Sequence, residues 1–317
     1  MLRKQLVTWI AAAAVGLAAC SDGAVGPGDA TEEDRQEILD LLDESGFFAD
    51  DFSAEGALPD AAAQAGAALF SGAAAEVTPP EVWGRRRLEV LRRSVTVDVD
   101  VPNGIAEVSK EIEFEGAFLL DITDDATINP TSKPLAHIFR QNAVFERRDQ
   151  EEVDAQGRPR RWRLVSISPA ELVMPDLATQ TVAITEVQIE VNGVPVLTIV
   201  DPSQVLDVET EILHLQQGDL VTVRAFTENA NVENMPPTFV YLHLFHASPV
   251  GRRWDRFLMD QADEAGTEWV LSWTARQTGR ERIGVDAIDA ETFTTETEDD
   301  YRASVWGVPY LVEEGVE

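Results

Sequence analysis

The hydrophobic pattern near the amino terminus has the period of a helix. Ile38 and Leu42 are four positions apart and lie on one helical face. Thr31 precedes this stripe as a suitable N-cap, and Gly46 follows it as a residue that readily ends a helix. The pattern therefore predicts a helix over residues 32–45.

A second helix is expected in the alanine-rich segment 59–76, which begins with Pro59 and stops before Pro79-Pro80. Beyond it, from Ser94 onward, the period changes to two, which is typical of strands with one buried face. This pattern predicts a strand that leads to the turn at Asn103-Gly104, a long return strand, and further strands at 135–148 and 161–167.

The second half of the chain reads as strand throughout. Turn residues such as Asn192-Gly193 and Gly218-Asp219 separate short apolar segments. The strands predicted there are 181–191, 194–200, 205–213, 220–228, 238–246, 268–275, 281–288 and 301–307. Eight short strands between residues 181 and 307 favour a β-sandwich.

The element order predicts an α+β roll, in which helices pack on a curved antiparallel sheet, followed by an all-β sandwich domain. The order of the elements over 31–168, closed by RRWRLVSISP, resembles the NTF2-like or cystatin-like superfamily. Within 181–317, the segments GDLVTVRAFTEN and GRERIGVDAID resemble Ig-like strands of bacterial surface proteins, without their cysteine pair. Residues 169–180 are expected to be a linker.

The net charge narrows the range of partners. The chain of 317 residues carries 57 acidic against 25 basic side chains, a formal charge of −32. Long-range repulsion argues against nucleic acid and against direct adsorption to anionic lipid. One cysteine excludes an intramolecular disulfide and a cysteine-based zinc cluster.

That cysteine stands at the end of an export-type leader. Arg3 and Lys4 precede the apolar stretch 6–19, which is shorter than the roughly 20 residues that span a bilayer. Leu17-Ala18-Ala19-Cys20 resembles the lipobox of bacterial lipoproteins. The resemblance implies a signal peptide at 1–19, diacylation at Cys20 and attachment to a membrane.

A tether is expected at 20–30, because this segment is rich in glycine and has no sustained apolar pattern. By the same resemblance, Ser21 after the cysteine favours the outer membrane in a host with two membranes. The alternative is an ordinary signal peptide or membrane anchor with an incidental cysteine.

Three residues of the predicted roll are candidates for a ligand site: Lys110 on the apolar face of its strand, His137, and Trp162. A buried cation needs a partner, so these residues would hold a polar or anionic ligand. Alternatively, a bulge or a strand end lets Lys110 reach water, and His137 is an ordinary half-buried residue.

The sequence gives weaker support for metal sites and for catalytic motifs than for this ligand site. His243 and His246 are three positions apart on a predicted strand and would point to opposite faces, which argues against a shared metal. The acids Glu296, Glu298, Asp299 and Asp300 favour a solvated loop over a calcium site. We predict no metal and no cofactor, because no hydrolase elbow, phosphate loop or dinucleotide motif occurs.

These observations favour a non-enzymatic, membrane-anchored envelope lipoprotein that binds a small ligand or another envelope protein. One alternative is a hydrolase or isomerase that uses a pocket in the roll, which requires polar side chains converging in a closed cavity. Another is a surface adhesin that binds glycan or protein through the sandwich, for which exposed Trp254 and Trp306 would be expected.

Overall fold

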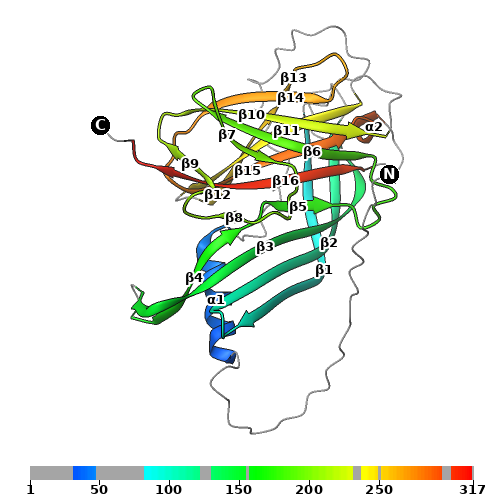
Figure 1. The fold of residues 1–317 in the computed structure, drawn as a ribbon. Coiled ribbons are helices and arrows are strands. Elements are labelled where there is room, and N and C mark those ends of the chain that lie inside the picture. Colours follow the sequence, from blue (N-terminus) through cyan, green and yellow to red (C-terminus); the bar gives the residue numbers. More distant parts are fainter. Residues whose placement is uncertain are drawn as a thin grey trace, which may run out of the picture.

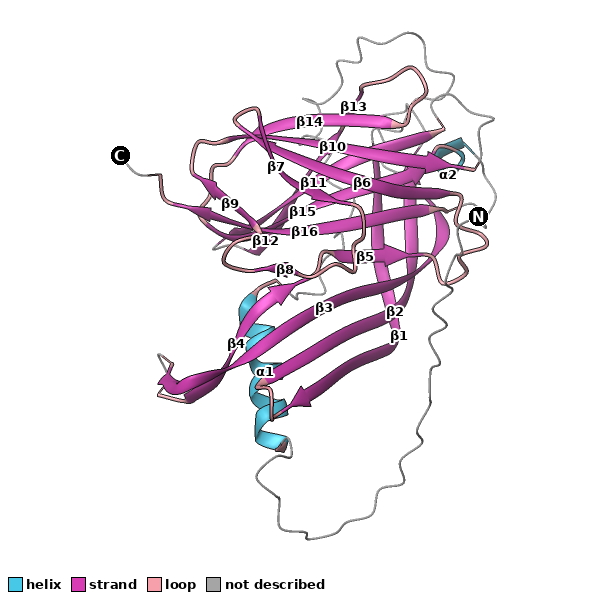
Figure 2. Cartoon of the chain, in the orientation of Figure 1, coloured by secondary structure: helices cyan, strands magenta, loops and turns pink. Residues whose placement is uncertain are grey.

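The computed structural model describes residues 31–47, 82–121, 130–154, 157–230, 237–248, 251–294 and 301–315. This part of the chain contains two helices and sixteen strands (Figures 1 and 2). The helices are α1 (Glu32–Ser45) and the short α2 (Glu291–Thr294). No helix within these ranges is long and apolar enough to cross a bilayer.

Helix α1 forms where the sequence predicts it. Thr31 and Asp34 make a reciprocal capping box, in which each side chain accepts a hydrogen bond from the other residue's backbone N–H, both at 3.1 Å. Gly46 closes the helix at φ 72°, a conformation that costs glycine little. The buried residues Ile38 and Leu42 face the sheet.

Three long antiparallel strands follow: β1 (Val82–Asp100), β2 (Ile105–Asp121) and β3 (Thr131–Val153). Alternate residues of β2 are buried, as the period of two predicts. Strand β1 contains two bulges, which accommodate Leu88 and Leu91 as extra residues. It is therefore longer than the strand expected from Ser94.

The remaining strands are short or of moderate length, and most pair antiparallel with their neighbours (Figure 1). They are β4 (Pro159–Ile167), β5 (Ala170–Val173), β6 (Val182–Val191), β7 (Val194–Ile199), β8 (Leu206–Asp207), β9 (Leu213–Gln216), β10 (Leu220–Asn229), β11 (Thr238–Ser248), β12 (Gly251–Leu258), β13 (Asp260–Gln261), β14 (Glu268–Thr274), β15 (Gly279–Asp289) and β16 (Ala303–Glu313).

Two sheets result. The larger has eleven strands and the central order β1-β2-β3-β5-β16-β15-β11-β12, with β4, β8 and β9 attached at its side. The smaller has five strands in the order β13-β14-β10-β6-β7. A large apolar core includes Trp83 and Phe139 of the first half together with Val187, Val223 and Trp269 of the smaller sheet.

A second apolar core lies under α1. It joins Ile38 and Leu42 of the helix to Phe145, Trp162 and Ile167 of the sheet. Both cores use the same face of β2, because its even-numbered residues contribute to each of them.

The predicted α+β roll followed by a separate sandwich is wrong. The described chain is mainly β, and the long strands do not wrap around helices, since α1 covers only one end of the larger sheet (Figure 2). Strand β5 pairs with β3 on one side and with β16 on the other, which joins the two halves in a single sheet. Alternation predicts which segments are strands, but it does not determine their partners.

The positions of individual strands agree with the prediction better than the overall architecture does. The hairpin turn at Asn103-Gly104 is confirmed, and β6, β7 and β10 match their predicted ranges within two residues. Strand β12 is absent from the prediction, and β16 runs six residues further than predicted. The predicted helix at 59–76 lies outside the described residues.

Strand β5 lies inside the segment 169–180 that the sequence predicts to be a linker. Residues 175–179 that follow it are exposed. We expect limited proteolysis to cut after Leu177, which is 62% exposed, and the two fragments to remain associated, because backbone pairing through β5 and the shared core persist.

The measurement is size-exclusion chromatography of the nicked protein with and without urea, with cleavage sites assigned by mass spectrometry. Fragments that separate without urea would instead support two independent domains at the predicted boundaries.

Candidate functional site

The three predicted ligand residues lie far apart on the sheet. His137 pairs in register with Phe114, Lys110 with Gln141, and Trp162 with Arg147. His137 and Arg147 are both on β3 and ten residues apart, which corresponds to roughly 33 Å of strand. One small ligand therefore cannot contact all three residues.

Lys110 lies on the inner face of β2, between the two apolar cores. Val108 on one side belongs to the core under α1, whereas Ile112 on the other belongs to the large core. Lys110 pairs in regular register with Val95 and Gln141, so no bulge carries it to water. It is 8% exposed, and its Nζ lies 5.7 Å from the Phe139 ring centroid.

A cleft of about 280 Å³ opens beside Lys110, between α1 and the β1–β2 hairpin. We call it the helix cleft. The helix contributes Asp40 and Asp43, and the opposite wall carries Arg93, Val95 and Lys110. The two walls of the helix cleft therefore carry charges of opposite sign.

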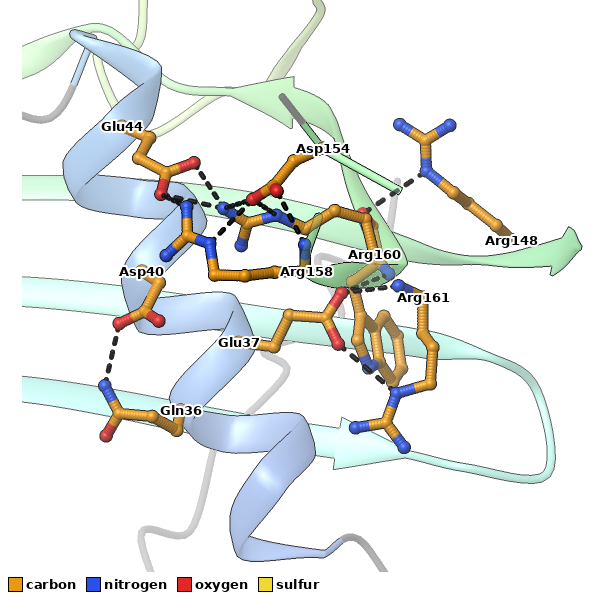
Figure 3. A network of polar contacts seen from close by, with 10 residues as sticks. Gln36, Glu37, Asp40, Glu44, Arg148, Asp154, Arg158, Arg160 and Arg161 are labelled. Atoms are coloured by element: carbon orange, nitrogen blue, oxygen red, sulfur yellow. Dashed lines mark hydrogen bonds and ion pairs between the residues drawn. The ribbon is translucent and has the colours of Figure 1, made fainter. Parts of the chain in front are cut away.

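Helix α1 is held against β4 by a polar network (Figure 3). The Glu37 carboxylate accepts hydrogen bonds from the backbone N–H groups of Arg161 (2.5 Å) and Trp162 (2.9 Å). Trp162 in turn donates its indole N–H to Asp34 at 3.0 Å. Trp162 is thus a fully buried support for the helix and not a ligand contact.

Burial alone would raise the pKa of Asp34. The hydrogen bonds from Trp162 and Thr31 outweigh burial and hold the pKa of this carboxyl below its usual value. Asp34 is therefore a charged acceptor at neutral pH, which strengthens its bond to the indole.

Arginines at the start of β4 extend this network to the end of the helix. Arg160 donates from Nη2 to both carboxylate oxygens of Glu44, at 2.7 and 2.6 Å, and Arg158 donates to the same carboxylate at 2.6 Å (Figure 3). Both arginines also pair with Asp154. The wall of the helix cleft is therefore fixed along its whole length.

Replacement of Glu37 by alanine should lower the free energy of unfolding by about 2 kcal/mol, because two backbone donors in this partly buried contact lose their acceptor. Urea denaturation followed by circular dichroism measures the change. Asp40→Ala is the control, since among the described residues the Asp40 carboxylate accepts a side-chain hydrogen bond from Gln36 of the same helix, at an exposed position. Its loss should cost less than about 0.5 kcal/mol. Equal losses in the two variants would contradict this role of Glu37.

A second polar cluster is buried in the large core, and the sequence does not predict it. Arg85 on β1 donates two hydrogen bonds to Asp286 on β15, at 2.5 and 2.8 Å. Its Nε donates to the Tyr301 hydroxyl at 2.7 Å, and that hydroxyl lies 3.2 Å from His137 Nε2. His243 Nε2 lies 3.0 Å from the Asp286 carboxylate.

The pKa values of this cluster show how it is charged. Burial, and then the Arg85 charge, lower the pKa of His137 to about 3, so His137 is neutral at physiological pH. Burial alone would raise the pKa of Asp286, but Arg85 and the His243 hydrogen bond hold it below its usual range. The cluster is thus a buried ion pair bonded to a neutral histidine through tyrosine.

A smaller cavity of about 150 Å³ lies at a break in the larger sheet. We call it the sheet-break cavity. Strand β3 pairs with β4 up to Ala143–Ile167 and with β5 from Arg140–Glu171, and Ser168 connects the two pairings. The lining of the sheet-break cavity includes Ser109, Lys110, Gln141, Ser168, Glu171 and Ser203.

The remaining candidate residues are either buried in the sheet or lie outside the described part of the chain. Trp306 is buried, at 4% exposure, so it does not form an exposed aromatic patch; the side chain of Trp254 lies outside the described part. His243 is on strand β11 as expected. The acids at 296–300 and Cys20 also lie outside the described ranges.

Within those ranges, no group of three or more histidine, cysteine or acidic side chains is placed to bind a metal ion. No protein-family model matches this chain, and no curated protein matches it in sequence.

Proposed function

We propose that this protein is an envelope lipoprotein, anchored through acylated Cys20, whose β body binds a small polar ligand in the helix cleft. The leader and the lipobox-like Leu17-Ala18-Ala19-Cys20 support the anchor. In a host with two membranes the outer membrane is the proposed location. Two or more acyl chains at one residue give durable attachment.

The helix cleft is the observation that carries the binding function. Acidic side chains on α1 face the cationic wall formed by Arg93 and Lys110, with the apolar Val95 between them. A small zwitterion complements both walls at once, because each of its charges meets the opposite sign. We therefore propose a zwitterionic small molecule as the ligand class.

A catalytic function is less well supported than ligand binding. Four described groups have strongly shifted pKa values: His137 and Asp286 in the Arg85 cluster, and Tyr241 and Tyr310. All four are buried and none lines the helix cleft. Within the cluster, Asp286 is bonded to Arg85 and His243, and His137 is bonded to Tyr301, which suits structural support more than turnover of a substrate.

Metabolic labelling with radioactive palmitate tests the anchor. The wild-type protein should carry the label and fractionate with membranes, whereas Cys20→Ala should lose the label. Label that persists in Cys20→Ala, or an unlabelled wild type, would overturn the proposed attachment.

Thermal unfolding with free L-amino acids as zwitterionic probes tests the helix cleft. At ten times its Kd, a bound probe stabilises the protein by about 1.4 kcal/mol, or about 2 °C in Tm. Val95→Trp, which places a bulky side chain at the cleft, should abolish the shift. Val196→Trp on β7, at a residue 50% exposed, should retain it.

The binding proposal fails if no amino acid raises Tm, or if Val95→Trp responds like Val196→Trp. Palmitate labelling gives its result independently of this measurement, so the anchor and the ligand site are tested separately.

A further inference from the structure

Strand β1 forms an open edge of the larger sheet. It stands at the end of the strand order and, among the described strands, pairs with β2 alone (Figure 1). Residues 88–96 of β1 are all exposed, so neither face of this stretch is closely packed. The backbone N–H and C=O groups that point away from β2 therefore form the kind of edge to which another strand adds.

Bulges disturb only one half of this edge. Both bulges of β1 lie between Arg87 and Arg92, and a bulge twists an edge away from a second strand. From Arg92 to Asp100 the register with β2 is regular over nine residues, and this stretch contains no proline. We call the stretch 92–100 the β1 edge, because it is the part of β1 along which a second strand can pair.

The two faces of the β1 edge differ in character. Val95, Val97 and Val99 lie opposite the buried, inner-face residues of β2. Val97 and Val99 pack partly against the core under α1, whereas Val95 is 37% exposed. The outer face carries the intervening residues, which are all exposed: Arg92, Ser94, Thr96, Asp98 and Asp100.

The sequence of the β1 edge is complementary to itself. When the edge is placed antiparallel to that of a second copy, with a two-fold axis at Thr96, all nine residues pair and the inner faces of both sheets stay on the same side. On the inner face, Val95 then lies opposite Val97 of the second copy. On the outer face, Arg92 lies opposite Asp100 of the second copy, and the symmetry repeats both contacts.

We propose that two copies of this chain associate through the β1 edge into a symmetric dimer with one continuous sheet. A second copy suits this edge better than an acidic segment of another protein, because acidic neighbours already balance the local positive charge. Arg92 pairs with Glu111 at 2.5 Å and with Glu113 at 3.6 Å in its own chain. This dimer is independent of the ligand and the anchor proposed above.

The net charge of −32 on each copy opposes association at long range. At an ionic strength of about 0.15 M, exposed charges more than about 8 Å apart are largely screened, whereas side chains that lie directly opposite on paired strands are closer than this. The interface is small, so we expect a weak dimer whose proportion rises with protein concentration.

Sedimentation velocity of the full chain at this ionic strength tests the proposal. We expect a species of twice the chain mass of 34.8 kDa. Thr96→Glu places two carboxylates directly opposite each other at the axis and should weaken the dimer at least tenfold. Thr198→Glu is the matched control, since Thr198 is exposed on β7, the edge strand of the smaller sheet, and it should leave the dimer unchanged.

Thr96→Cys tests the register directly. Residues that lie opposite each other on antiparallel strands have Cα atoms about 4.5–5.5 Å apart, which is within the range that a disulfide requires. Mild oxidation should therefore give a covalent dimer in which the tryptic peptide 94–110 is joined to itself, as identified by mass spectrometry. Thr198→Cys should not form the corresponding link.

A chain that stays monomeric up to about 1 mM would overturn the proposal and would leave the β1 edge to a strand of another protein. Unchanged association in Thr96→Glu, or equal weakening by Thr96→Glu and Thr198→Glu, would also overturn it. Circular dichroism checks that each variant is folded. If Thr96→Glu does not fold, the cross-link decides, and equal cross-linking of Thr96→Cys and Thr198→Cys would contradict the proposed register.

Discussion

Arg85→Met should lower the free energy of unfolding by about 3–5 kcal/mol, because it leaves Asp286 as an uncompensated buried charge. Asp286 is fully buried, and Arg85 supplies two of its hydrogen bonds. This loss is a large part of the 5–15 kcal/mol that typically stabilises a folded protein. Urea denaturation followed by tryptophan fluorescence measures it.

Arg86→Met is the matched control. Arg86 is the next residue on β1 and is exposed, so its substitution should change stability by no more than about 0.5 kcal/mol. The double variant Arg85→Met/Asp286→Leu should recover part of the loss, since it removes both members of the ion pair. A loss below about 1 kcal/mol for Arg85→Met, or strictly additive losses in the double variant, would contradict the coupling.

Acidification from pH 7 to pH 5 should destabilise the protein by about 2 kcal/mol through His137 alone. The pKa of His137 is about 3 in the folded protein and about 6.5 in the unfolded chain. Above pH 6.5 both states are neutral at this residue and the stability is fully present. As the pH falls below 6.5, only the unfolded state gains the proton, so stability is lost until about pH 3.

His137→Gln keeps a hydrogen-bonding side chain beside Tyr301 but removes the titrating ring. The difference between its unfolding free energies at pH 7 and pH 5 should be about 2 kcal/mol smaller than in the wild type, whatever its stability at pH 7. His243, which also bonds Asp286, is present in both proteins, so the comparison isolates His137.

If His137→Gln keeps the full dependence on pH, then His137 is not the residue that resists protonation.

The Arg85 cluster shows why part of the fold could not be predicted. Arg85 lies in a run of three arginines, in a segment with no regular alternation. Its partner Asp286 is 201 residues away along the chain. Nothing local distinguishes Arg85 from its exposed neighbour Arg86, because its burial depends on the strand that packs across it.

The surroundings of Lys110 could be predicted only in part. Alternation along β2 correctly places it on the apolar face between Val108 and Ile112. The sequence does not reveal that two separate cores meet there, or that the break at Ser168 opens a cavity beside Gln141. His137 and Trp162 are also buried, but each has different neighbours.

The sequence by itself determined the local elements of this protein. The cap at Thr31, the end at Gly46 and the alternation along β2 depend on neighbouring residues, and neighbours are what a sequence displays. Only the tertiary structure decided that β5 joins both halves in one sheet, which residues line the two cavities, and which charges pair in the core. Strand order and buried pairing arise between residues far apart in the chain, and the periodicity of a strand does not specify which other strand it meets.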